Sequence, residues 1–152
     1  MEIPAWIETQ VQKLNSKTQG YTEKEKSKAG YSYLKNALYL VPEKIADETT
    51  LQEFKAKSEH LIDTLPIKQD GGKLEYGSYP SALSSYKNEI KKEYNMVSKG
   101  TYLNQGALGM PVGFILGLLF GSIIFGMLIG LTAGMAMGSA LENKAKKENR
   151  LL

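Results

Sequence analysis

Few side chains in this sequence could take part in a reaction. The single histidine, His60, could act as a general acid or base, but that role needs a partner group that the sequence does not indicate. The chain has no cysteine, which excludes a thiolate nucleophile and a cysteine metal site. We therefore predict no catalytic residue, no metal ligand and no cofactor, and we expect that the protein is not an enzyme.

One short run could in principle bind a cation. Asp70-Gly71-Gly72 offers a carboxylate followed by two flexible positions, as a calcium loop does. The further carboxylates and the closing glutamate of an EF-hand loop are missing, and Gly71-Gly72-Lys73 does not match a phosphate-binding loop. We interpret the run as a turn.

The basic residues do not form a nucleic-acid-binding stripe. The formal charge is +3, and lysines alternate with acids, as in Lys24-Glu25-Lys26. Every basic residue except Arg150 is a lysine, which disfavours the bidentate contacts by which arginine recognises bases and phosphates. This pattern is typical of a solvated surface, and we expect no nucleic acid as a partner.

Tyrosine is unusually frequent outside the apolar part of the chain. Core packing or a membrane interface explains most such tyrosines, and a surface that binds another protein is the alternative. The residues are Tyr21, Tyr31, Tyr33, Tyr39, Tyr76, Tyr79, Tyr86, Tyr94 and Tyr102.

Eight glycines with regular spacing form the clearest pattern in the sequence. Steps of four residues separate them, except for one step of five in the middle. They are Gly109, Gly113, Gly117, Gly121, Gly126, Gly130, Gly134 and Gly138. Small residues repeated in this way allow helix backbones to approach closely in a lipid environment. Since glycine costs about 1 kcal/mol in an aqueous helix, we predict that these positions serve helix packing.

These glycines lie in a segment, residues 106–141, that has no charged side chain. Such a stretch exceeds the roughly 18 apolar residues that indicate a transmembrane helix. One straight helix over it would be about 54 Å long, well beyond the hydrocarbon core of about 30 Å. We therefore predict a hairpin that reverses at residues 122–125. Its expected glycine pairs are Gly121 with Gly126, Gly117 with Gly130, Gly113 with Gly134 and Gly109 with Gly138.

The same spacing leaves alternatives open. The glycines could also join several copies into an oligomer, including a pore or permeability factor, although Ser122, Thr132 and Ser139 are too few to line an aqueous channel. Each arm is short, so a re-entrant loop that does not cross the bilayer fully remains a second geometry.

The glycine-rich segment resembles the glycine-zipper two-transmembrane proteins of bacteria. The resemblance covers the last third of the chain, from Gly109-Met-Pro-Val-Gly113 through Gly134-Met-Ala-Met-Gly138. It implies two close-packed transmembrane helices in a bacterial membrane and says little about activity.

Basic residues flank this segment on both sides. Lys87, Lys91, Lys92 and Lys99 precede it, and Lys144, Lys146, Lys147 and Arg150 follow it. Because cytoplasmic flanks carry the excess of Lys and Arg, both ends are expected in the cytoplasm and the protein in the inner membrane. The second cluster could also contact lipid headgroups at the membrane surface.

The polar part of the chain predicts four amphipathic helices. Apolar spacing places them at residues 3–15, 22–41, 50–65 and from Leu83 to near Gly100. Thr22 with Glu25 and Thr50 with Glu53 match the capping-box pattern of a helix start. Pro42 and Pro66 mark helix ends, and residues 69–80 read as a loop or a short hairpin.

The sequence thus predicts an all-α protein with a small soluble helical bundle followed by a C-terminal transmembrane helical hairpin. Its expected parts are a cytosolic domain (residues 1–105), the hairpin (106–141) and a basic cytosolic tail (142–152). The expected function is a membrane anchor for a cytosolic module that binds an unidentified protein. The lipid bilayer is a partner, and a homo-oligomer is possible on the same packing logic.

Overall fold

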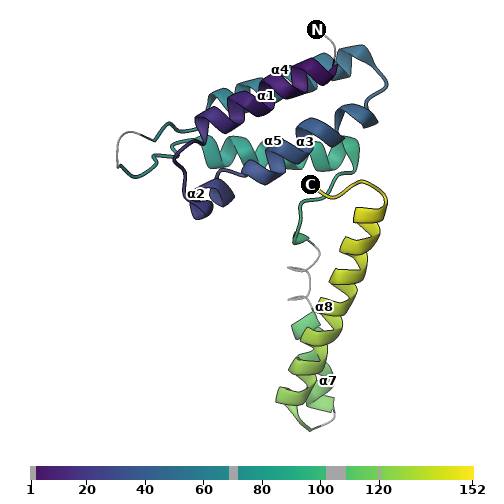
Figure 1. Ribbon diagram of the computed structural model, residues 1–152. Coiled ribbons are helices and arrows are strands. Elements are labelled where there is room, and N and C mark those ends of the chain that lie inside the picture. The colour runs from purple at the N-terminus through teal and green to yellow at the C-terminus, as the bar shows by residue number, and fades with distance from the viewer. Residues whose placement is uncertain (1–2, 69–71, 102–108, 120) are drawn as a thin grey trace. The chain divides into compact units, whose positions relative to one another are not determined.

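The computed structural model describes residues 3–68, 72–101, 109–119 and 121–152 (Figure 1). These ranges contain seven α-helices and one 3-10 helix, and no strand is formed in them. The helices are α1 (Ile3–Lys17), α2 (Glu23–Lys28), α3 (Tyr31–Leu40), η1 (Pro42–Lys44), α4 (Glu48–Asp63), α5 (Tyr79–Tyr94), α7 (Gly109–Leu119) and α8 (Ile123–Lys147). The all-α prediction is confirmed.

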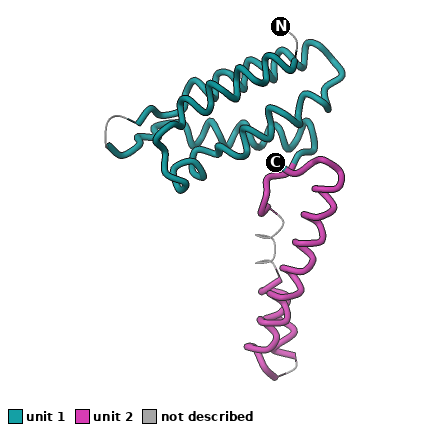
Figure 2. Tube along the Cα trace, viewed as in Figure 1, with its two compact units in different colours: residues 1–96, 152 teal, residues 97–151 magenta. Residues whose placement is uncertain are grey.

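The chain forms two compact units (Figure 2). Unit 1 contains residues 1–96 and Leu152, and unit 2 contains residues 97–151. The chain therefore leaves unit 1 after Met96 and returns to it at Leu152. The predicted domain boundary after residue 105 lies outside the described residues.

The helix start at Thr22 agrees with the prediction, but the helix that follows is divided. The Thr22 Oγ1 atom accepts the Glu25 N–H at 3.3 Å, and the Thr22 N–H donates to Glu25 Oε2 at 2.7 Å, which completes the capping box. Gly30 then takes a φ of 68°, and a Cβ atom there would lie 2.9 Å from Leu83 Cδ2. Gly30 therefore separates α2 from α3, where the sequence indicated one continuous helix.

The start of α4 differs from the prediction. Asp47 is its N-cap, because Asp47 Oδ2 accepts the Thr50 N–H at 2.8 Å. The Thr50 hydroxyl donates to the same oxygen at 2.9 Å. Thr50 lies inside the first turn, so the predicted Thr50–Glu53 capping box is wrong.

The fourth predicted helix begins earlier and ends earlier in the sequence than expected. α5 begins at Tyr79 with Pro80 in its first turn, where the missing proline N–H needs no partner. It ends at Tyr94 and not near Gly100, and its C-cap, Asn95, has a left-handed φ of 53°. The described loop residues before α5, 72–78, form no hairpin.

Large apolar side chains fill the interior of unit 1. The most deeply buried of them are Leu14, Leu34, Leu38, Val41, Phe54, Ile62 and Met96. The Phe54 ring packs edge-on against Trp6 and Tyr94, with centroids 6.1 Å and 6.3 Å away. Such pairs add about 0.5–1.5 kcal/mol beyond the burial of their surface.

Most of the tyrosines belong to this core. Tyr79 donates its hydroxyl hydrogen to the Ala29 carbonyl at 2.7 Å, and the Tyr86 hydroxyl lies 2.8 Å from Ser58 Oγ. Tyr21 donates to the Pro66 carbonyl, and its burial raises the pKa of the phenol to about 12. Each ring is buried with a partner for its polar end, which confirms the core interpretation for these tyrosines.

Candidate functional site

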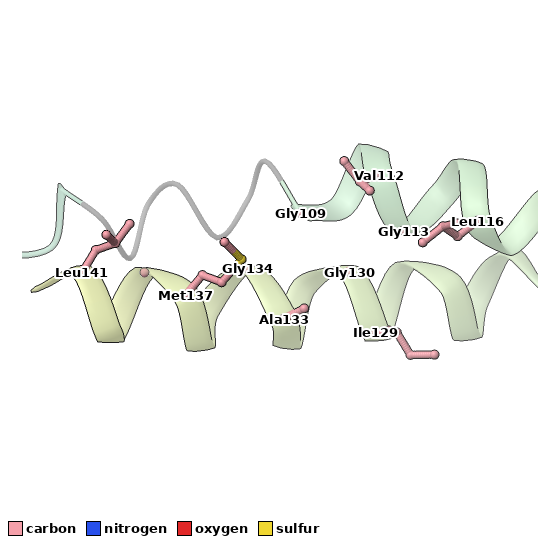
Figure 3. Close-up of a pocket in the computed structure, with 11 residues that line it drawn as sticks. Gly109, Val112, Gly113, Leu116, Ile129, Gly130, Ala133, Gly134, Met137 and Leu141 are labelled. Atoms are coloured by element: carbon pink, nitrogen blue, oxygen red, sulfur yellow. The ribbon is translucent and has the colours of Figure 1, made fainter.

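Helices α7 and α8 pack directly against each other through glycine (Figure 3). A Cβ atom on Gly130 would lie 2.8 Å from Gly113 Cα, and one on Gly117 would lie 2.8 Å from Ile123 Cα. A Cβ atom on Gly109 would overlap the Gly130 carbonyl oxygen. The partner number falls as the α7 number rises, so the two helices run antiparallel. Their backbones touch where no side chain intervenes.

The pairing has a different register from the predicted one. Gly117 meets Gly126, not Gly130. Gly113 meets Gly126 and Gly130, not Gly134. Gly109 meets Gly130 and Gly134, not Gly138. The partners on α8 are thus about one helical turn closer to the connection between the helices than expected.

The position of the chain reversal explains this shift. The Ser122 N–H donates to the Gly117 carbonyl at 2.8 Å, and Gly121 has a left-handed φ of 75°. This is a Schellman ending, in which glycine occupies the left-handed position after the helix. α8 then begins at Ile123, so the predicted reversal at residues 122–125 is wrong.

Gly121 consequently has another role from the one predicted for it. A Cβ atom on Gly121 would meet nothing within 4 Å. Its glycine is required by the backbone conformation of the turn and not by helix packing. Gly134 and Gly138, further along α8, both line an apolar groove, and Gly138 is buried.

A shallow apolar groove of about 390 Å³ runs along the α7–α8 pair (Figure 3). Its walls carry only glycine, alanine and larger apolar side chains, among them Val112, Leu116, Ala133 and Met137. A groove without a polar side chain offers no group that could fix the orientation of a polar ligand.

The outer surface of the pair is also apolar. Its exposed large side chains outside the groove include Ile115, Leu118, Leu119, Ile124, Phe125 and Leu128. Leu119 is 75% exposed and Ile124 is 72% exposed. The Thr132 hydroxyl donates back to the Leu128 and Ile129 carbonyls of its own helix. In the described part of the chain, α8 is the one helix long and apolar enough to cross a membrane, and α7 is a shorter apolar helix.

Four residues join the beginning of unit 2 to its end, and we refer to Val97, Gly100, Glu142 and Arg150 as the clasp. The Val97 N–H donates to the Arg150 carbonyl at 2.7 Å. The Gly100 N–H lies 3.3 Å from both carboxylate oxygens of Glu142. The segments that enter and leave the α7–α8 pair are therefore hydrogen-bonded to each other.

The predicted membrane-surface residues divide into two groups. Lys144, Lys146 and Lys147 occupy the last turn of α8 and are exposed. Arg150 instead donates to Glu148 from Nε at 2.8 Å, and this bond lowers the pKa of the Glu148 carboxyl. The clasp residues Gly100 and Glu142 were not identified from the sequence, because the hydrogen bond between them joins positions far apart in the chain.

The other positions considered in the sequence form no site in the described ranges. His60 is exposed on α4, and no cluster of potential metal ligands occurs among the described residues. Asp70 and Gly71, from the candidate cation loop, and Tyr102 lie outside these residues.

Comparison of the chain with protein-family models, with curated proteins and with solved structures finds no significant match. The resemblance of the last third to glycine-zipper two-transmembrane proteins therefore remains a prediction.

Proposed function

We propose that the protein is a non-enzymatic integral membrane protein in which α7 and α8 form a transmembrane hairpin that anchors a cytosolic helical module. The observation that carries this proposal is that unit 2 has small residues inside and large apolar side chains outside, the reverse of a core formed in water. Glycines fill the contact between α7 and α8, while large apolar side chains such as Leu119 and Ile124 point outward. Water would disfavour so much exposed apolar surface, whereas lipid would solvate it.

The dimensions of α8 support a full crossing. Its uncharged part, residues 123–141, is about 28 Å long at 1.5 Å per residue, close to the hydrocarbon thickness of about 30 Å. The described part of α7 is 11 residues long, or about 16 Å, and it begins after residues that are not described.

The clasp supports a hairpin over a single crossing. Val97 and Arg150 lie near opposite ends of unit 2 in the sequence and are hydrogen-bonded to each other. In a membrane that α7 and α8 cross, the two ends of the unit would therefore lie on the same side. Lysines precede and follow the apolar helices, and this excess of basic residues favours the cytoplasm for that side. The inner membrane of a bacterium, with both flanks cytoplasmic, is the location we propose.

A labelling experiment tests this topology, and the absence of native cysteine makes it simple. Lys24→Cys in unit 1, Asn143→Cys on α8 and Ser122→Cys at the turn are treated with an impermeant maleimide in intact spheroplasts. We expect labelling of the Ser122→Cys protein alone, and labelling of the other two only after permeabilisation. Labelling of Asn143→Cys from outside would contradict the hairpin, and protection of all three would indicate a re-entrant loop.

The pore remains the competing function for the same hairpin, and the structure offers it little support. The groove lining is apolar, and the Thr132 hydroxyl is already engaged by its own helix. We expect no release of a trapped dye from liposomes that contain the purified protein. Rapid leakage that rises steeply with protein concentration would instead favour an oligomeric pore.

The exposed apolar side chains of unit 1 are the candidate contacts for a partner of the cytosolic module. Tyr39 is 44% exposed and Ile67 is 73% exposed, whereas Tyr21, Tyr33, Tyr79 and Tyr86 are buried. A photo-crosslinking residue at either position should capture a cytosolic protein in living cells. The same residue at Ser32, which is exposed and polar, serves as the control, and equal capture from Ser32 would argue against a specific surface.

A further inference from the structure

We infer that the clasp end of unit 2 binds the headgroups of anionic phospholipids through Lys99, Lys144, Lys146 and Lys147. The inference rests on the proposed membrane insertion and adds the class of lipid that the protein selects. We refer to these four residues as the lysine cluster.

The acids near the cluster are already engaged inside unit 2. Glu142 accepts the Gly100 N–H, and Glu148 accepts hydrogen bonds from Arg150. The four lysines are exposed and form no salt bridge or hydrogen bond with any described residue. Lys144 is close enough to Glu148 to help lower the pKa of that carboxyl, so part of its charge is offset there. Lys99, Lys146 and Lys147 carry charges that no ion pair with a described residue offsets, and the cluster keeps a net positive charge for a partner outside the chain.

The position of the cluster matches the headgroup layer. The uncharged part of α8 ends at Leu141, and Lys144, Lys146 and Lys147 follow within the next two turns. The hydrogen bond between Gly100 and Glu142 brings the backbone next to Lys99 to the same end of α8. The cluster therefore draws on both the entering and the leaving segment, and it begins where the hydrocarbon should end.

The chemistry of the side chains favours lipid over nucleic acid. Lysine acts as a point charge toward phosphate and attracts an anionic leaflet by about 1 kcal/mol per residue, or about fivefold. The cluster contains no arginine, which is the residue suited to bidentate recognition of bases and phosphates. Leu141, the last residue of the uncharged part of α8, is exposed and would face a bilayer.

The test measures lipid selectivity of the full chain reconstituted into bilayers. Electron paramagnetic resonance compares how strongly the protein immobilises spin-labelled phosphatidylglycerol and phosphatidylcholine. We expect a preference of about fivefold for the anionic lipid in the wild type, weakened in about 0.5 M salt. Replacement of all four cluster lysines by Gln should bring the preference close to one.

A matched control removes the same number of charges from unit 1. Lys24, Lys28, Lys44 and Lys73 are exposed and form no salt bridge with a described residue, so their replacement by Gln should preserve the preference. Equal loss in both variants would mean that net charge and not the cluster attracts the lipid, and this result would overturn the inference.

Two further outcomes separate this inference from the proposed function. Equal immobilisation of both lipids by the wild type would refute anionic selectivity while leaving membrane insertion in place. Immobilisation of neither lipid would refute membrane insertion itself. Tight binding of double-stranded DNA that depends on the cluster would also overturn the inference, because it would assign these lysines to a different partner.

Discussion

Units 1 and 2 distribute large and small side chains in opposite ways. In unit 1 the large side chains are inside, where Phe54 is 2% exposed and Ile62 is fully buried. In unit 2 the glycines Gly113, Gly117 and Gly126 are buried and the large side chains are outside. Side chains are therefore packed in two opposite ways in one chain, as the proposed insertion of unit 2 into a membrane requires.

The energetic reason differs between the units. Unit 1 gains stability by removing apolar surface from water, so the volume of its core side chains matters. Unit 2 gains nothing from this effect if its surroundings are lipid, and its helices associate through close backbone contact. Replacement of a large core side chain by a small one should therefore destabilise unit 1. Replacement of a contact glycine by a larger residue should instead disrupt the packing of α7 against α8.

The largest expected effect is on unit 1. Phe54→Ala removes a buried ring that contacts Trp6 and Tyr94, and it should lower the free energy of unfolding of unit 1 by about 3–5 kcal/mol. Urea unfolding followed by Trp6 fluorescence measures the change. Insertion of α7 and α8 into the bilayer should not change, and a parallel loss of insertion would contradict the separation of the two ways of packing.

The reverse experiment enlarges a glycine in unit 2. Gly113→Leu would force side-chain atoms against the Gly126 and Gly130 backbones, and such overpacking costs about 1–3 kcal/mol or separates the helices. Spin labels at Ile115 and Leu128, both exposed, would report an increased distance between α7 and α8.

Ala136→Leu is the matched control for that experiment, because Ala136 is exposed on α8 and does not line the groove. The same enlargement there should leave the distance unchanged. If Gly113→Leu and Ala136→Leu behave alike, the glycine contact does not determine the packing of unit 2.

The sequence predicts much of unit 1 because its local signals are strong. Apolar spacing identifies α1 and α4, and the Thr22–Glu25 box marks the start of α2. The division at Gly30 was missed because it depends on the tight approach of Leu83, a contact from a distant helix. Asp47 was missed because Thr50 with Glu53 gives an equally good capping pattern three residues later.

For unit 2 the sequence predicts which glycines lie in the contact between the two helices better than it predicts which glycines face each other. The four-residue spacing identifies Gly113, Gly117, Gly126 and Gly130 as packing positions, and each lies in the α7–α8 contact. The register of the two helices depends on how many residues form the turn between α7 and α8. Gly121 could join either the packing stripe or the turn, and only the hydrogen bond from Ser122 to Gly117 decides between them.

The cap of α4 gives a smaller and more local prediction. Asp47→Ala removes the acceptor for the Thr50 N–H and should destabilise unit 1 by about 1 kcal/mol. Glu53→Ala should have almost no effect, since Glu53 lies beyond the cap. Urea unfolding measures both changes. A larger loss of unfolding free energy from Glu53→Ala than from Asp47→Ala would support the capping box at Thr50 instead of the cap at Asp47.

The smallest expected effect is a pH dependence confined to unit 1. Bonds to the Thr22 backbone and to Lys68 lower the pKa of the Glu25 carboxyl from 4.5 to about 2. A lowered pKa means that the ionised form stabilises the folded state above pH 4.5 and that this contribution is lost as the pH falls toward 2. Glu25→Gln should therefore lower the Tm at pH 6 and flatten its fall between pH 4.5 and 2.

Glu43→Gln is the control for this titration, because Glu43 is exposed and forms no ion pair with a described residue. Asp47 and Asp63 also have lowered pKa values, so the wild-type curve sums several carboxylates, and the difference between the two variants isolates Glu25. Helices α7 and α8 contain no ionisable side chain before Glu142. The distance between spin labels on these two helices should therefore stay constant while the Tm of unit 1 falls, and a change in that distance over the same pH range would mean that the two units do not respond independently.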